Sequence, residues 1–275
     1  MELRKLGKTD LMVSEVSMGT WSTFDKKGTD GVGYVAELME AAISAGVNLF
    51  DTAPRYGMAE RNLGRALPRL AAKNLPDPLI ATKVARSSRA GAQDEIKEIR
   101  VRLGRMPDIL QVHNLQGWRE VLPALIALKS EGMIKAVGVS HYDPLAFNEI
   151  ERAMRTGKVD LIQIPYNLME RQAEKRLLPL AQEMDIGVLV MTPITPLYQR
   201  GKITNHLADL PYNELAAFGV QDAGGLCLKY LLSKNPQVVL LPATSKQERA
   251  KSNAAVSGTP PLPPEWIERL EKIFA

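Results

Sequence analysis

The sequence predicts an α/β fold in which eight strand–helix units close into a (β/α)8 TIM barrel, and three observations lead to this prediction. First, the chain has 275 residues, and barrels of this kind routinely use about 250 residues as one domain. Second, short apolar runs alternate with segments of helical periodicity. Third, no Gly-x-Gly-x-x-Gly turn follows the first run, as a doubly wound sheet would normally show. We therefore expect a single domain over residues 1–275.

Eight apolar runs, rich in β-branched residues and each ending in a small or polar residue, are the candidate strands. Strands that alternate with helices pair in parallel, and parallel strands are buried on both faces, which such runs allow. Eight of them favour a closed barrel, because closure leaves no sheet edge exposed. The runs are Val13–Met18, Asn48–Asp51, Leu79–Lys83, Ile109–His113, Ala136–Ser140, Leu161–Pro165, Gly187–Met191 and Val238–Pro242.

The segments between these runs predict helices, because apolar residues recur in them at helical spacing. Several of these segments are followed by a glycine, which is typical of a helix C-terminus. The clearest predicted helices are Val35–Ala45, Asp94–Leu103, Val121–Glu131 and Ala173–Met184.

Three further segments lie outside the strand–helix repeat. Residues Met1–Leu11, with a turn at residues 7–10, predict a two-strand hairpin that plugs the bottom of the barrel. The stretch Thr192–Tyr212, rich in proline and polar residues, predicts a long loop over the top, and long loops at that face usually carry function. At the end of the chain, a proline-rich linker over residues 257–264 precedes a predicted tail helix, Glu265–Phe274.

Composition and charge narrow the class of partner. The chain carries 35 basic and 31 acidic residues, a net charge of +4, without a separate basic run, so we expect no nucleic-acid partner. No stretch approaches about 18 consecutive apolar residues, and the first residues lack the apolar core of a signal peptide. The single cysteine, Cys227, excludes an internal disulfide. We expect a soluble, cytoplasmic protein with no membrane partner and no metal site, and its oligomeric state stays open.

Four polar residues end the predicted strands or follow them directly. Asp51 ends the second run, Lys83 the third and His113 the fourth, and Tyr56 lies in the loop after the second run. In a barrel of this kind, catalytic groups gather at the carboxyl ends of the strands. Each residue alone has an ordinary structural interpretation, as a helix cap, a packed turn residue, a surface lysine or a hydrogen-bonding histidine. Their joint arrangement favours a catalytic site.

These four residue types suit hydride transfer to a carbonyl, in which negative charge builds on oxygen and must be met by a proton donor. Tyr56 is the candidate donor. The reference pKa of a phenol, about 10, is too high unless a cation lies beside it. We expect Lys83 to be that cation and Asp51 to hold its ammonium group. His113 is expected to orient the carbonyl by donating a hydrogen bond.

Residues 51–64, Asp-Thr-Ala-Pro-Arg-Tyr-Gly-Met-Ala-Glu-Arg-Asn-Leu-Gly, form a motif that is similar to the Asp-Thr-Ala-x-x-Tyr-Gly-x-x-Glu-x-x-Leu-Gly signature of the aldo-keto reductase superfamily. Residues 82–84, 111–113 and 132–140 match further family segments in the expected order, so the resemblance covers nearly the whole chain. It implies reversible carbonyl reduction with NAD(P)H bound extended across the top of the barrel. It also implies that the Asp-Tyr-Lys-His tetrad is complete.

The resemblance implies cofactor contacts as well. Ser140 and Gln163 match residues that hydrogen-bond the nicotinamide carboxamide, and Tyr166 matches the aromatic residue that stacks on its ring and fixes the hydride face. Arg249 would pair with the adenosine 2′-phosphate and Asn253 with adenine, which favours NADPH, with NADH as the alternative. The expected cofactor-binding residues are Gly19, Thr20, Ser140, His141, Gln163, Tyr166, Thr192, Ser245, Lys246, Arg249 and Asn253.

Three positions depart from the family pattern. His141 stands where the family usually has Asn. Residues 192–201 read Thr-Pro-Ile-Thr-Pro-Leu-Tyr-Gln-Arg-Gly instead of Pro-Leu-x-x-Gly, so contacts to the pyrophosphate do not carry over position by position. Ala243 occupies a position where many NADPH-dependent members carry a basic residue, which weakens the prediction of NADPH but not that of the chemistry.

The expected substrate is a small carbonyl compound. Trp21, after the first run, and Tyr198, in the long loop, are the candidates to line its binding site. Two other functions stay open. A Schiff-base lyase would use Lys83 to attack a carbonyl and would give Tyr56 no role. A cofactor-sensing binding protein, like the family's channel-associated relatives, would bind the cofactor with little turnover, but the intact tetrad favours an enzyme.

Overall fold

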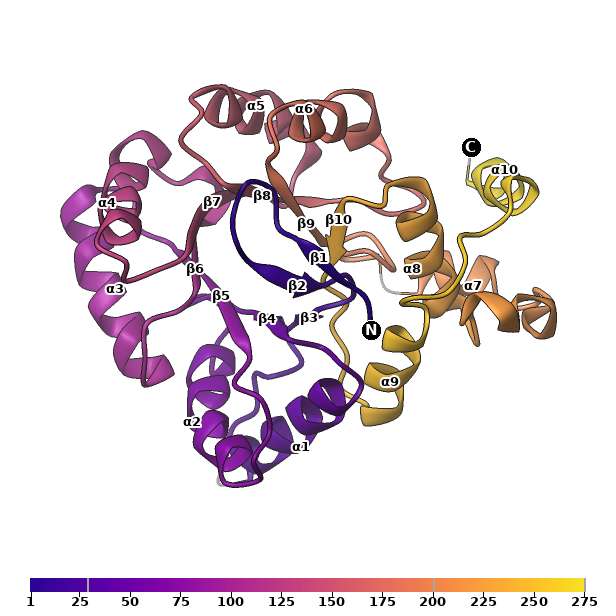
Figure 1. Cartoon of the computed structure of the whole chain (residues 1–275), viewed down its shortest axis with the longest axis horizontal. Coiled ribbons are helices and arrows are strands. Elements are labelled where there is room, and N and C mark those ends of the chain that lie inside the picture. The colour runs from indigo at the N-terminus through magenta and orange to yellow at the C-terminus, as the bar shows by residue number, and fades with distance from the viewer. Residues whose placement is uncertain (29, 200, 275) are drawn as a thin grey trace.

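Eight parallel strands form the centre of the computed structural model, which describes residues 1–28, 30–199 and 201–274. Neighbouring strands follow one another in chain order, and a bridge between Val16 and Leu240 joins the two ends of the sheet. The sheet is therefore a barrel, as predicted, and Figure 1 shows the helices around it. The barrel strands are β3 (Met18–Gly19), β4 (Leu49–Asp51), β5 (Leu79–Val84), β6 (Ile109–Val112), β7 (Ala136–Ser140), β8 (Leu161–Pro165), β9 (Gly187–Met191) and β10 (Val238–Leu240).

Each barrel strand sends alternate side chains into two different cores. In β4, Leu49 belongs to the cluster inside the barrel, whereas Phe50 belongs to the cluster between the sheet and the helices. The next residue, Asp51, therefore points inward again. The same alternation in β5 turns Ala81 and Lys83 inward. A polar residue at the carboxyl end of a strand thus comes to lie inside the mouth of the barrel.

A helix follows each barrel strand and covers the outside of the sheet. In α1, Val35, Leu38 and Met39 are buried, the spacing of a helix with one face on a core. Helix α3 begins after Ser88, whose side chain accepts a backbone hydrogen bond, and ends at Gly104 in the left-handed region. These helices are α1 (Gly31–Ser44), α2 (Ala59–Ala71), α3 (Arg89–Leu103), α4 (Trp118–Ser130), α5 (Phe147–Arg155), α6 (Leu177–Glu183), α8 (Ala223–Lys234) and α9 (Gln247–Ala255).

The first predicted strand is where the structure differs most from the prediction. Residues Leu3–Lys5 (β1) pair antiparallel with Met12–Ser14 (β2), so the hairpin takes the beginning of the run Val13–Met18 and leaves only β3 to the barrel. The reason is packing, because Leu6, Leu11 and Val13 all fill the bottom of the barrel interior. Figure 1 shows this hairpin crossing the barrel opening, which confirms the predicted plug.

Smaller corrections concern segment ends and the long loop. The fourth run stops at Val112, and His113 opens a 3-10 turn, η1 (His113–Leu115). Predicted helix Ala173–Met184 consists of a 3-10 turn, η3 (Gln172–Lys175), and α6. The 3-10 turn η2 (Pro144–Ala146) leads into α5.

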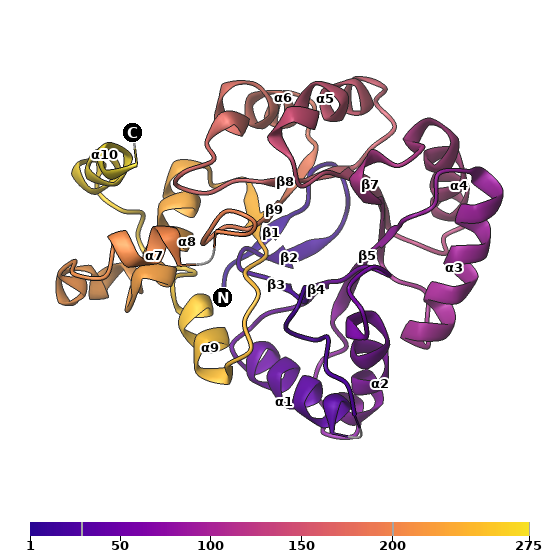
Figure 2. The ribbon, with the colours of Figure 1, turned by 180° about the vertical axis from the view of Figure 1, so that it is seen from behind.

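The stretch predicted as a loop, Thr192–Tyr212, contains a short helix, α7 (Lys202–His206), and leads into η4 (Tyr212–Phe218). The tail helix is present as α10 (Pro264–Ile273). Figure 2 shows that α7 and α10 lie outside the ring of helices, on the side of α8. Arg200 in this stretch and the terminal Ala275 lie outside the described residues.

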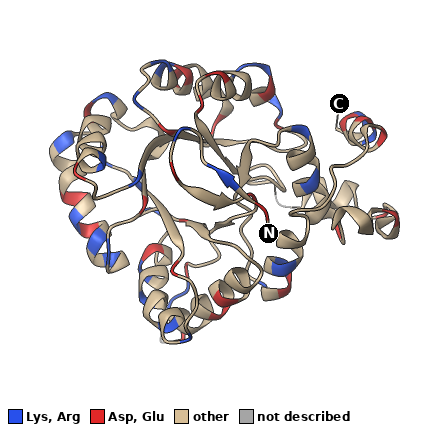
Figure 3. Ribbon diagram, in the orientation of Figure 1, with Lys and Arg blue, Asp and Glu red and all other residues tan. Residues whose placement is uncertain are grey.

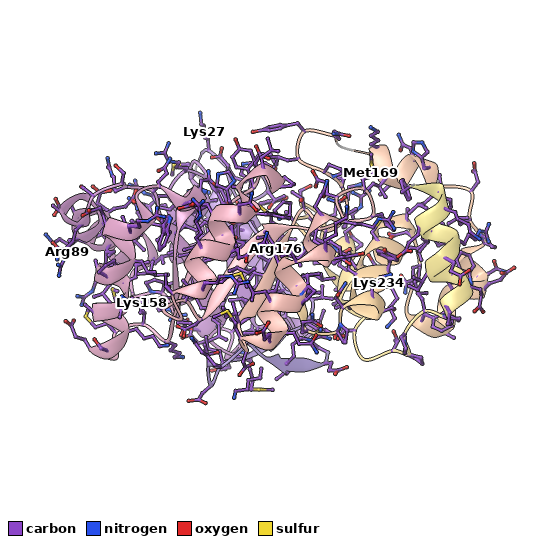
Figure 4. The ribbon with its side chains drawn as sticks, turned by 90° about the horizontal axis from the view of Figure 1, so that it is seen from above. Lys27, Arg89, Lys158, Met169, Arg176 and Lys234 are labelled. Carbon is purple, nitrogen blue, oxygen red and sulfur yellow. The ribbon has the colours of Figure 1, made fainter. Side chains whose placement is uncertain are left out.

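The loops that follow the barrel strands and the loops that precede them lie at opposite ends of the barrel. Figure 4 places Lys27 and Met169, from the loops after β3 and β8, on the face opposite the hairpin, and Lys158, from a loop that precedes a strand, on the side of the hairpin. In Figure 3 the charged residues of both signs colour mainly the outer helices. Among the described residues, no helix is long and apolar enough to cross a membrane. The face that carries the strand carboxyl ends is therefore where the site is sought.

Candidate active site

The strand register brings the predicted catalytic residues to the same level of the barrel. Asp51 ends β4, and Lys83 lies near the end of the adjacent β5. His113 follows β6 directly, two residues after Gln111, which pairs with Lys83 in register. All of these side chains point inward by the alternation described above. Residues that end successive strands in the sequence therefore lie side by side in the mouth of the barrel.

Lys83 and Asp51 form a buried ion pair. The Lys83 Nζ donates to Asp51 Oδ1 at 2.9 Å, to Asp51 Oδ2 at 2.7 Å and to the carbonyl oxygen of Thr52 at 2.9 Å. Burial alone would lower the pKa of Lys83, but the Asp51 carboxylate and the nearby Tyr56 outweigh it and raise this pKa above its usual value. An ammonium group with three acceptors and a raised pKa stays protonated. Lys83 is therefore held as a cation, which disfavours its attack on a carbonyl and so disfavours the Schiff-base interpretation.

Tyr56 lies beside this cation. The Lys83 Nζ is 5.1 Å from the centroid of the Tyr56 ring, and the ring of His113 meets it edge-on with centroids 6.1 Å apart. Burial raises the pKa of Tyr56, the positive charge of Lys83 opposes this rise, and Asp51 adds to it. The predicted influence of Lys83 is thus present, but burial outweighs it in the free protein. The phenol keeps its proton at neutral pH and has one to donate.

His113 is a neutral hydrogen-bonding group. Burial first, and then the charges of Lys83 and Arg55, lower the pKa of His113 to about 3. Its Nδ1 is buried without a hydrogen-bond partner among the described residues. A neutral imidazole carries one N–H, so it can donate to a carbonyl oxygen without delivering a charge.

Two residues that hold this arrangement were not singled out from the sequence. Glu60 is buried, accepts a hydrogen bond from Thr82 Oγ1 at 2.5 Å and pairs with Arg102, so it ties α2 to β5 one residue from Lys83. Asn167 is fully buried and its Nδ2 donates to the Thr192 carbonyl oxygen at 3.2 Å, which joins the loops after β8 and β9. Glu60 lies inside the signature motif, and Asn167 directly follows Tyr166 in the chain. Both positions therefore lie in or beside segments that resemble the family, and this is the signal that could have identified them.

Six of the expected cofactor contacts lie near the carboxyl ends of β3, β7, β8 and β9. Ser140 and Gln163 pair in register, and the Ser140 Oγ donates to the Val112 carbonyl oxygen at 3.3 Å. Gly19 ends β3, and a Cβ there would lie 3.0 Å from the carbonyl oxygen of Leu241. The six residues are Gly19, Thr20, Ser140, His141, Gln163 and Thr192.

The polar atoms of these residues fit a nicotinamide carboxamide, which both donates and accepts hydrogen bonds. Gln163 Oε1, Thr20 Oγ1 and Thr192 Oγ1 are buried acceptors without a partner in the described parts of the chain. His141 Nδ1 accepts the Asp143 backbone N–H at 3.0 Å, which places the ring proton on Nε2 as a donor. Burial lowers the pKa of His141, so that ring is also neutral. His141 can therefore replace the amide that the family usually has there.

The structure does not bring Tyr166 into this site. Its side chain has no exposed surface and packs in the core between the sheet and the helices. Its hydroxyl donates to Glu174 Oε1 at 2.6 Å and accepts from Asn235 Nδ2 at 2.6 Å. A ring enclosed in this way offers no face to a nicotinamide. The predicted stacking role is therefore wrong, and Met191, which ends β9 half-buried on the inner face above Leu189, lies nearer the mouth.

The segment expected to hold the adenosine end lies at the start of α9. Lys246 precedes the helix, and its backbone N–H donates to Thr244 Oγ1 at 3.1 Å. The Tyr34 hydroxyl donates to the Ser245 carbonyl oxygen at 2.7 Å, which fixes this segment to α1. Arg249 is exposed in the first turn and Asn253 is buried one turn later. An exposed cation at the start of a helix fits a phosphate group.

The two residues predicted to line the substrate site meet each other. The Trp21 and Tyr198 rings lie edge to face with centroids 6.3 Å apart. Trp21 is 37% exposed and Tyr198 is 82% exposed, so both offer apolar surface to solvent. The loop after β9 therefore reaches the loop after β3 at this point of the rim.

The mouth of the barrel thus holds a protonated phenol, a buried cation and a neutral imidazole, groups that suit an oxidoreductase acting on a carbonyl compound. Comparisons with known proteins agree. The chain matches the Aldo/keto reductase family model over residues 15–275. It therefore belongs to the aldo/keto reductase family.

Individual relatives support this assignment. The aldo-keto reductase YhdN of Bacillus subtilis is 28% identical, over 74% of this chain and 65% of its own length. The NADH-specific methylglyoxal reductase of Escherichia coli is 28% identical, over 72% of this chain and 69% of its own. The holo form of aldo-keto reductase AKR11C1 from Bacillus halodurans is 27% identical with a TM-score of 0.77, covering 99% of this chain and 96% of that one.

Proposed function

We propose that this protein reduces aldehydes or ketones to alcohols with NADPH, using Tyr56 as the general acid. When bound, the cofactor supplies the hydride to the carbonyl carbon. As the carbon–oxygen π pair moves onto oxygen, Tyr56 Oη gives that oxygen its proton, and solvent later returns a proton to the phenolate. The observation that carries the proposal is the Tyr56 phenol between the Lys83 ammonium and the neutral His113 ring.

The other three residues act on this proton transfer without giving up protons themselves. Lys83 stabilises the phenolate that forms, because a cation beside an oxyanion favours the charged state. Asp51 holds the ammonium through two hydrogen bonds. The His113 ring, neutral at working pH, donates to the carbonyl oxygen and sets its distance from Tyr56.

The choice of NADPH rests on Lys246 and Arg249 at the start of α9. A dianionic 2′-phosphate gains more from these cations than the hydroxyl group of NADH does. The relative named as NADH-specific makes NADH the alternative cofactor.

The test is consumption of NADPH, and separately of NADH, with a panel of aldehydes, diketones and aldoses. Tyr56→Phe is expected to lower kcat by a factor on the order of 10² or more, because only the acid is removed, with cofactor affinity nearly unchanged. Tyr212→Phe is the matched control, since Tyr212 lies in η4 and its hydroxyl donates to the carbonyl oxygen of Leu207, which follows α7, and not to a residue of the tetrad.

Turnover retained in Tyr56→Phe would overturn the assignment of the acid. Tight NADPH binding without turnover in the wild type would instead favour the cofactor-sensing function. In that case a stable partner complex becomes the next thing to look for.

A further inference from the structure

Arg55 is an arginine at the mouth of the site that the reaction steps above do not use. It precedes Tyr56 in the chain, and its side chain is exposed. The Nη2 donates to the Ala85 carbonyl oxygen at 3.3 Å and to Gln116 Oε1 at 3.4 Å. Ala85 lies two residues after Lys83, and Gln116 lies three residues after His113. The guanidinium group therefore sits where the loop that carries Tyr56 meets the segments that follow Lys83 and His113.

The charge of Arg55 is not neutralised by the protein. Among the described residues no carboxylate pairs with it, and both of its hydrogen bonds are long ones to neutral oxygens. In the neighbouring helix α3, Glu95 is already committed, with Oε2 accepting the Ala85 N–H at 2.5 Å and Oε1 lying 3.8 Å from Arg86 Nε. The Lys83 charge is balanced by Asp51. The net charge at this part of the mouth is thus positive.

The positive charge of Arg55 acts on His113, one of the groups proposed to contact the carbonyl oxygen. After burial and Lys83, Arg55 is the next cause that lowers the pKa of His113. Its Nε and Nη1 donors have no acceptor in the described parts of the chain, and a guanidinium group binds a carboxylate through two parallel hydrogen bonds. A carbonyl compound with a carboxylate a few atoms from its aldehyde carbon could meet Arg55 and the Tyr56–His113 pair together.

We propose that Arg55 binds a carboxylate of the substrate, so that the site prefers carbonyl compounds that carry a negative charge. This inference rests on the reductase function proposed above and names its substrate class. A neutral aldehyde would leave the guanidinium group in water and gain nothing from it. The preference is therefore expected to appear in KM more than in kcat.

The experiment compares succinic semialdehyde and glutaric semialdehyde with their methyl esters, which keep the aldehyde and remove the charge. For the wild type, kcat/KM is expected to be at least about tenfold higher for an acid than for its ester. In Arg55→Gln this ratio is expected to fall by about tenfold or more through a higher KM for the acid, and Arg55→Lys is expected to keep part of it. Arg86→Gln is the matched control, because Arg86 lies on the same rim but is paired with Glu95, and it is expected to keep the wild-type ratio.

Two outcomes would overturn the inference. One is a wild type that does not favour the acids, and the other is an equal loss of kcat/KM for acid and ester in Arg55→Gln, which would mean that Arg55 only joins the loops. Absence of turnover with every aldehyde would contradict the reductase function instead. Calorimetric binding of succinate to the NADPH-treated protein would then decide the role of Arg55, with binding lost in Arg55→Gln supporting it and equal binding refuting it.

Discussion

The pKa of His113 shows how strongly burial and nearby charges change the protonation of a single side chain. Its pKa is held at about 3 by burial, assisted by Lys83 and Arg55, whereas a histidine in an unfolded chain titrates near pH 6.5. Between these values the unfolded chain binds a proton that the folded protein does not. The free energy of unfolding therefore falls as the pH drops from about 6.5 toward 3, and the His113 contribution is intact above that window.

This predicts that His113→Asn makes stability less sensitive to acid. Between about pH 6.5 and 4.5 the wild type is expected to lose on the order of 2 kcal/mol more than the variant. Denaturant unfolding at several pH values measures this difference. Parallel stability curves for the two proteins would show that His113 is not held neutral.

Residue types at strand ends and just after them predicted that Asp51, Tyr56, Lys83 and His113 lie together, but they failed for Tyr166. Asp51, Lys83 and His113 belong to or directly follow runs in which alternation decides the direction of each side chain. Tyr166 directly follows β8, and continuing the alternation from the inward Leu161 turns its ring outward, into the core between the sheet and the helices, where its hydroxyl bonds Glu174 and Asn235. These partners are 8 and 69 residues away, so no local pattern could reveal them.

Among the elements, the loops after β5 and β6 depend on one glycine for their close contact. Gly117 has a φ of +55°, and a Cβ there would lie 1.9 Å from the Ser87 carbonyl oxygen. These loops carry the residues next to Lys83 and His113. Two neighbours of His113, Asn114 and Leu115, also have positive φ values of 51° and 54°. The path of η1, and with it the position of the imidazole, thus relies on the absence of a side chain at Gly117.

Gly117→Ala is expected to destabilise the protein by about 3 kcal/mol or more, because backbone strain adds to the collision with Ser87. It is also expected to lower kcat/KM by displacing His113. Gly132→Ala is the control, since Gly132 has a φ of +71° but no atom within 4 Å of its would-be Cβ, and strain alone costs about 1 kcal/mol. Thermal unfolding and steady-state kinetics measure both effects, and equal losses in the two variants would contradict the role of the loop contact.

For the whole molecule, the hairpin closes the barrel at the end opposite the active site. Leu6 is 1% exposed and lies so close to Gly187 that a Cβ there would be 2.6 Å from its Cδ1. The inner core that it completes extends through alternate residues of the barrel strands up to the polar layer. The hairpin core at the bottom and the candidate active site at the top are thus separated by the length of the strands.

Leu6→Ala is therefore expected to lower the free energy of unfolding by about 2–5 kcal/mol, through lost burial and a cavity, while kcat and KM stay close to the wild type below the melting temperature. Leu3→Ala, in the same hairpin but 45% exposed, is expected to change stability by less than about 0.5 kcal/mol. Denaturant unfolding and kinetics on both variants test this. A large loss of activity in a folded Leu6→Ala protein would show that the two ends are coupled.

The sequence by itself determined the number of strand–helix units, their order and the four polar residues at the barrel mouth, because periodicity and strand ends are local properties. Tertiary structure decided which strand Met12–Ser14 joins, that Trp21 meets Tyr198, and that Arg55 lies between the loops after β5 and β6. Each of these depends on contacts between segments distant in the chain. The pKa shifts of Tyr56 and His113 also depend on tertiary structure, because burial, which only the folded barrel provides, is the main cause of both.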